Sequence, residues 1–137
     1  MNNADILLPL LVQISLTLIM FILLAVRKSA AVKTGEIDRK KAALDNSAWN
    51  KETVQVSNNI ANQFQTPVLF YLLVMFFFVT NSVSSLVIWL AWAYVVTRII
   101  HAFVHVTSNY IPYRLGSFTL GVLVLLIMTG LAVSSYL

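Results

Sequence analysis

Polar side chains that can do chemistry recur at regular spacing in an otherwise apolar segment. Arg98, His101, His105 and Asn109 are separated by three, four and four residues. At roughly 100° per residue, this spacing puts all four on one face of a helix. A guanidinium group and two imidazoles on one face can bind an anionic group such as a carboxylate, and an imidazole can also transfer a proton.

A second polar set precedes it. Asn58, Asn62 and Gln65 fall within a narrow arc of a helix that continues into apolar sequence. Amides both donate and accept hydrogen bonds, so they can satisfy Arg98 and also contact a ligand. We predict that the amides form one wall of a buried polar site and the Arg/His stripe the other. The alternative, that the amides only join membrane helices, stays open.

Other site chemistries have less support. His101 and His105, four residues apart, could share a metal ion, but a catalytic zinc needs a third protein ligand and no carboxylate lies within an apolar segment. We therefore predict no metal site. The chain has no cysteine, and its serines and threonines have no apparent His–Asp partner.

The composition is that of an integral membrane protein. Of the 137 residues, 59% are hydrophobic and only 10% are charged, whereas soluble domains are about 25% charged. A membrane-spanning helix needs about 20 apolar residues. We predict four spans in a single domain covering 1–137, and so an all-α membrane protein built as a four-helix up-down bundle in a lipid bilayer. The spans are 6–26, 56–79, 83–106 and 115–137.

Charge predicts the orientation. The segment 27–53 holds seven of the nine Lys and Arg residues, so the positive-inside rule makes it a basic cytoplasmic loop. Both termini then lie on the non-cytoplasmic side, and Arg114 lies in a second cytoplasmic loop. The net charge of +4 is too localised to indicate a nucleic-acid partner.

Three residues predict helix boundaries. Gly35 suits the end of the first helix. Pro67 removes a backbone donor and crowds the carbonyl of Gln63, which predicts a kink beside the amides. Pro112 discourages helix at Ile111.

The motifs NNIANQFQTPVLFY and RIIHAFVHVTSNYIPYR, with the chain length, four spans and basic first loop, resemble the MAPEG family of membrane-associated proteins in eicosanoid and glutathione metabolism. The resemblance implies a homotrimer that binds glutathione as cosubstrate between subunits, near the cytoplasmic face. The second-helix motif of the family has Arg, Asn and Glu where this chain has Asn58, Asn62 and Gln65.

In the third helix, Arg98 matches the family motif, while His101 and His105 occupy the positions of two tyrosines. A later arginine, credited with activating the thiol, corresponds best to Arg114. By this resemblance Arg114 is the catalytic residue, and the other six residues bind the cosubstrate. The differences point to a divergent bacterial-type member.

The resemblance implies a glutathione- or other thiol-dependent transferase or peroxidase that acts on lipophilic small molecules. Two alternatives stay open: a non-catalytic lipid- or metabolite-binding protein of the same fold, and a small transporter. A bacterial inner membrane suits the compact chain, and an endoplasmic-reticulum membrane would suit it too.

Overall fold

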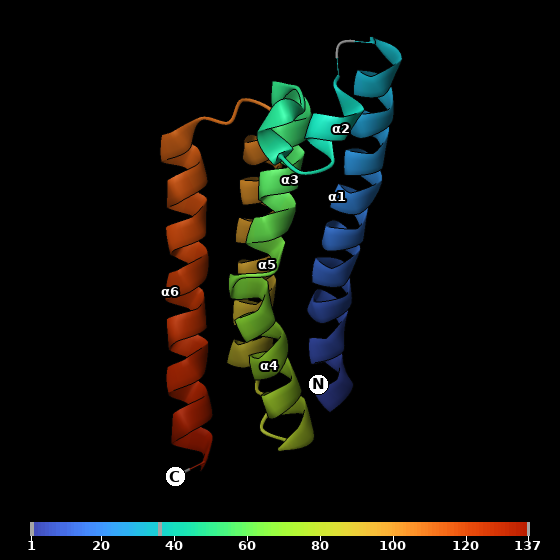
Figure 1. Ribbon diagram of the computed structural model, residues 1–137. Helices are drawn as coiled ribbons and strands as arrows, with labels where there is room; N and C mark the ends of the chain where they lie inside the picture. The colour runs from blue at the N-terminus through green and yellow to red at the C-terminus, as the bar shows by residue number, and fades with distance from the viewer. Residues whose placement is uncertain (1, 36, 137) are drawn as a thin grey trace.

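The computed structural model describes residues 2–35 and 37–136, and its long helices lie side by side (Figure 1). Four helical stretches are long and apolar enough to cross a membrane, which confirms the predicted all-α, four-span fold. They comprise α1 (Leu7–Lys33), α3 (Lys51–Gln63) with α4 (Thr66–Val79), α5 (Ser85–Val106) and α6 (Ile111–Tyr136). The labelled chain ends lie at the same end of the bundle.

The first helix extends beyond the predicted span 6–26 and ends just before Gly35, where its end was predicted. It begins after a 3₁₀ turn, η1 (Asn3–Ile6), and continues past Val26 to Lys33. Its 27 residues span about 40 Å, more than the hydrocarbon core of about 30 Å. Gly35 follows with a φ of 75°, the left-handed conformation expected of a residue just beyond a helix end.

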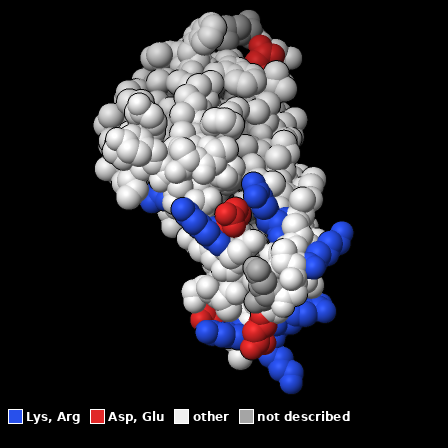
Figure 2. Space-filling view, turned by 90° about the horizontal axis from the view of Figure 1, so that it is seen from above, with Lys and Arg blue, Asp and Glu red and all other residues white. Residues whose placement is uncertain are grey.

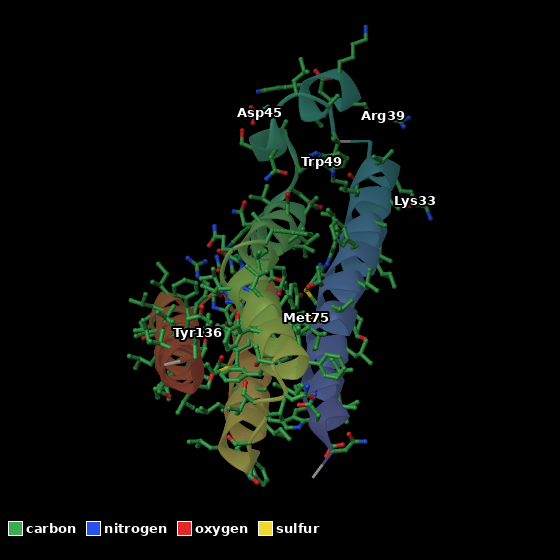
Figure 3. All side chains as sticks on the ribbon, turned by 90° about the horizontal axis from the view of Figure 1, so that it is seen from below. Lys33, Arg39, Asp45, Trp49, Met75 and Tyr136 are labelled. Carbon is green, nitrogen blue, oxygen red and sulfur yellow. The ribbon has the colours of Figure 1, made fainter. Side chains whose placement is uncertain are left out.

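The predicted basic loop contains two short helices, α2 (Arg39–Ala42) and η2 (Asn46–Ala48), and Glu36 of that loop lies outside the described residues. Lysine and arginine side chains gather over this end of the molecule (Figure 2). Trp49 lies between the loop and α1 (Figure 3). Its Nε1 donates to the carbonyl of Ala42, and Nζ of Lys28 lies 4.8 Å from its ring centroid. These contacts fold the loop back onto α1.

The second span is interrupted where the proline predicted a kink. Helix α3 ends at Gln63 and α4 starts at Thr66, with Pro67 in its first turn. Gln65 joins them in a non-helical conformation, with φ −100° and ψ −104°. Backbone N–H groups in the first turn of a helix have no partner within that helix, so the N–H that proline lacks is not missed there. Pro67 therefore fits the start of a new helix better than the interior of a continuous one.

The prediction that Pro112 discourages helix at Ile111 is wrong. Helix α6 begins at Ile111 rather than at residue 115, because Pro112 also falls in a first turn, where a missing N–H costs nothing. Arg114 is therefore part of a helix and not of a loop. The predicted last residue, Leu137, lies outside the described residues.

Helices α5 and α6 pack closely against each other at Gly121. Gly121 of α6 faces α5, and a Cβ placed there would lie 2.9 Å from Oγ1 of Thr97. The Tyr94 ring stacks on Phe70 of α4, with ring centroids 4.5 Å apart. Its hydroxyl donates to Thr66 Oγ1 at 3.0 Å. Tyr94 thus ties α5 to the first residue of α4, beside the break.

Candidate functional site

A cavity of about 210 Å³ lies where the α3–α4 break, α5 and the start of α6 meet. Four of the seven predicted site residues line it, and the rest of its wall is apolar. The lining residues are Asn62, Gln65, His101, Ile111, Arg114, Leu115 and Phe118. The break in the second span creates one side of the cavity, because it turns Gln65 out of the regular helix.

Arg114 is half-buried, and both its guanidinium group and its backbone carbonyl make hydrogen bonds. Its Nη1 donates to Oδ1 of Asn109 at 2.7 Å. Its backbone carbonyl lies 3.0 Å from Nδ1 of His101 and accepts a hydrogen bond from Oγ of Ser117 at 3.0 Å. The guanidinium group and the helix start that carries it are therefore both positioned by side chains.

Asn109 does not continue the α5 stripe as predicted. Helix α5 ends at Val106, and Asn109 lies beyond it with a φ of 51°. Asparagine tolerates this left-handed conformation better than most residues. The turn brings its carboxamide back to Arg114, so the residue serves the connection between α5 and α6.

Arg98 is almost fully buried, with 1% of its surface exposed, and does not line the cavity. Its Nη2 donates to the backbone carbonyl of Asn62 at 3.2 Å. That carbonyl belongs to the last turn of α3, where the interrupted helix leaves carbonyls outside the regular ladder. Nε and Nη1 of Arg98 have no partner among the described residues. Arg98 thus stabilises the broken end of α3.

The remaining predicted residues lie outside the cavity lining. His105 is buried on the same face as His101, with ring centroids 5.7 Å apart. Asn58 is exposed, so the prediction that it forms part of a buried wall is wrong. Gln65, which does line the cavity, is exposed as well.

The sequence analysis did not predict a set of three buried, hydrogen-bonded amides. Gln13 of α1 donates through Nε2 to Oε1 of Gln63 at 2.9 Å, and Gln63 donates through Nε2 to Oδ1 of Asn59 at 3.2 Å. At most 1% of each is exposed. The available signals were the four-residue spacing of Asn59 and Gln63 and the single amide in the first span. These hydrogen bonds between buried amides join α1 to α3 inside the membrane.

A larger, almost wholly apolar groove of about 450 Å³ runs between α4 and α6. Its α4 wall begins at Thr66, the residue after Gln65, and its α6 wall begins at Val122, one turn past Phe118. The polar cavity and the groove therefore follow each other along the same pair of elements. Among the described residues, no group of three acidic or histidine side chains could hold a metal ion.

The model of the MAPEG family matches residues 6–134, nearly the whole chain. The protein belongs to the MAPEG family. No curated protein sequence and no solved structure matches it. Family membership supports a membrane protein of the glutathione and eicosanoid metabolism group, and it agrees with the four spans of the structure.

Proposed function

We propose that this MAPEG protein is a thiol-dependent transferase or peroxidase that uses glutathione, or a related thiol, on lipophilic substrates. The observation that carries the proposal is the convergence of Arg114, His101, Asn62 and Gln65 on one cavity. The cavity offers a cation, an imidazole and two amides at the edge of an apolar groove. These groups suit a polar thiol that reacts with a lipophilic electrophile bound in the groove.

Arg114 has the chemistry to activate the thiol. The thiolate is the nucleophile, and a free thiol has a pKa of about 8.5, so little is ionised at neutral pH. A guanidinium group near sulfur favours the ionised form and lowers the pKa of the thiol. The contact with Asn109 holds the guanidinium group of Arg114 by the cavity. Asn62 and Gln65 can pair with amide and carboxylate groups of the cosubstrate.

The size of the cavity supports a site completed by a neighbouring subunit, and the family resemblance implies a homotrimer. Small-molecule sites usually enclose about 300–1,000 Å³, more than this cavity offers within one chain. A neighbouring subunit would supply the missing wall, and large apolar side chains such as Phe103, Leu115 and Leu126 are exposed for that contact or for lipid. Light scattering of the protein in detergent, corrected for bound detergent, tests this: a monomer would remove the inter-subunit site.

The groove between α4 and α6 suits the lipophilic substrate. It is open to one side of the bundle, its wall is apolar, and it starts beside Gln65. A substrate could enter it laterally from the bilayer. Its reactive group would then lie next to the polar cavity, where the thiol is held.

The charge distribution supports the proposed orientation. Most of the basic side chains lie at the end of the bundle that carries α2. By the positive-inside rule, that end would face the cytoplasm and both termini the other side, and a bacterial inner membrane suits this arrangement. The cavity opens in the half of the bundle nearer the basic end, so it would draw on cytoplasmic thiols.

The test is turnover by the purified protein in detergent. Glutathione conjugation to an epoxide and reduction of a lipid hydroperoxide are measured for wild type, Arg114→Ala and Arg39→Ala. The second arginine is an exposed residue of α2 and serves as the matched control. We expect turnover in wild type and Arg39→Ala and a large loss in Arg114→Ala. Equal rates in all three would remove Arg114 from the mechanism.

Two observations favour a second function. The larger cavity is apolar, and the exposed Asn58 stands where the family motif has an arginine, so a bound lipid without thiol chemistry fits the same fold. Native mass spectrometry distinguishes the two: a retained lipid together with no glutathione binding supports this non-catalytic function.

A further inference from the structure

The hydrogen bond between His101 and Arg114 fixes which ring nitrogen carries the proton. Nδ1 of His101 lies 3.0 Å from the backbone carbonyl of Arg114. A carbonyl oxygen only accepts hydrogen bonds, so Nδ1 must be the protonated nitrogen. In the neutral ring, Nε2 then carries a lone pair and acts as an acceptor.

That lone pair has no partner in the part of the chain that the structure describes. Nε2 of His101 is shielded from solvent and unpaired, although the side chain lines the cavity. A buried acceptor without a donor is unfavourable, which makes a ligand that supplies a donor favourable there. His105 differs, because it does not line the cavity and its unpaired nitrogen is Nδ1.

We propose that His101 is the base that takes the thiol proton, a role that rests on the proposed function. The S–H bond of the cosubstrate breaks and its proton moves to Nε2 of His101, which leaves a thiolate beside Arg114. The sulfur electron pair then forms the C–S bond to an epoxide carbon, and the C–O bond breaks. The oxygen takes the proton from Nε2, so the ring returns to its neutral form and the product is a hydroxy thioether.

The charges around the ring make this transfer depend on the ligand. The groups that face His101 are the guanidinium groups of Arg98 on α5 and Arg114 on α6, with His105 one turn along α5. The α3–α4 break contributes only the uncharged amides of Asn62 and Gln65. A third positive charge, on His101 beside the two guanidinium groups, is unfavourable until a thiolate balances it. The imidazolium and the thiolate therefore form together.

Two substitutions separate this role from a structural one. His101→Asn keeps a side-chain N–H near the position of Nδ1, so it can still bond to the carbonyl of Arg114, but it has no basic nitrogen. His101→Leu loses both functions. If the ring only positions the start of α6, then His101→Asn should behave like wild type, and only His101→Leu should fail.

The experiment counts protons. Glutathione is titrated into the full-length protein in detergent by calorimetry, in two buffers of different ionisation enthalpy, to give the protons released on binding. The ultraviolet absorbance of the bound thiolate gives the amount of ionised thiol. S-methylglutathione, which has no thiol proton, serves as the control for all other protonation changes.

In wild type, we expect a thiolate signal with almost no proton release beyond that control, because His101 retains the proton. In His101→Asn, at neutral pH where the free thiol is still protonated before it binds, about one proton per thiolate should appear in the buffer. At neutral pH its thiolate signal should fall at least about tenfold, the change that one pKa unit produces.

A wild-type thiolate signal accompanied by about one released proton would overturn the role of His101 while leaving thiol activation by Arg114 intact. The wild-type count decides this even if a variant fails to fold. Retention of the full neutral-pH signal by folded His101→Asn would overturn it too. Absence of any thiolate signal in wild type would contradict the proposed function itself.

Discussion

Replacing Gln63 with leucine should destabilise the protein through the buried amide chain. The substitution removes the two hydrogen bonds that Gln63 makes, at 2.9 Å to Gln13 and at 3.2 Å to Asn59. Hydrogen bonds between membrane helices contribute about 0.6 kcal/mol on average and up to about 1.7. Both partners are fully buried and lose their acceptor or donor. We therefore expect the free energy of unfolding to fall by about 1–3 kcal/mol.

The assay is equilibrium unfolding in mixed micelles at one protein concentration, followed by circular dichroism. The control is Asn58→Leu, an exposed amide of the same helix, which should change stability by less than about 0.5 kcal/mol. In the double variant Gln13→Leu/Gln63→Leu, no amide of Gln13 remains unpaired, so the loss should be smaller than the two single losses together. Additive losses, or a Gln63→Leu loss no larger than that of the control, would refute the reasoning.

Further predictions concern the helix contact and the site. Gly121→Leu should destabilise the protein by about 1–3 kcal/mol, because its side chain would meet Thr97, whereas Gly130→Leu, with open space around it, should be nearly neutral in the same unfolding assay. Arg114→Ala should lower conjugation at neutral pH by about tenfold per pKa unit lost by the thiol, and a rate profile against pH should show recovery above about pH 8.5. Asn109→Gly should keep the turn and lose the guanidinium contact, so stability should change little while turnover falls; Asn109→Ala should lose both.

The four spans could be predicted because apolar length is a property of the sequence alone. The break at Gln65 was also visible, since Pro67 lacks a backbone donor. The start of α6 was not, because a proline is compatible both with a loop and with the first turn of a helix. Which one forms depends on contacts such as that between His101 and the carbonyl of Arg114, which join distant residues.

The amides show where periodicity stops being informative. Asn58 and Asn62 share one face of α3, and Asn59 and Gln63 share the next, at the same spacing of four. The sequence indicates that each pair lies together but not which pair faces the neighbouring helices. In the structure Asn59 and Gln63 face inward, where Gln13 of α1 pairs with Gln63.

The site was predicted in part for the same reason. Arg98 and His101 lie three residues apart on one buried face, yet only His101 lines the cavity, because Arg98 is directed to the carbonyl of Asn62 at the helix break. A side chain that stabilises an irregular backbone cannot be told from a ligand-binding one by spacing. The position of Arg114 by the cavity follows from the turn at Asn109, which the sequence did not indicate.

The most direct test of the central claim, that Arg114 and its neighbours ionise a thiol in the polar cavity, is an ultraviolet difference spectrum. Glutathione is added at neutral pH to wild type and to Arg114→Ala in detergent. We expect a saturable thiolate band in wild type that is lost or strongly reduced in the variant. No band in wild type, or an equal band in both proteins, would contradict it.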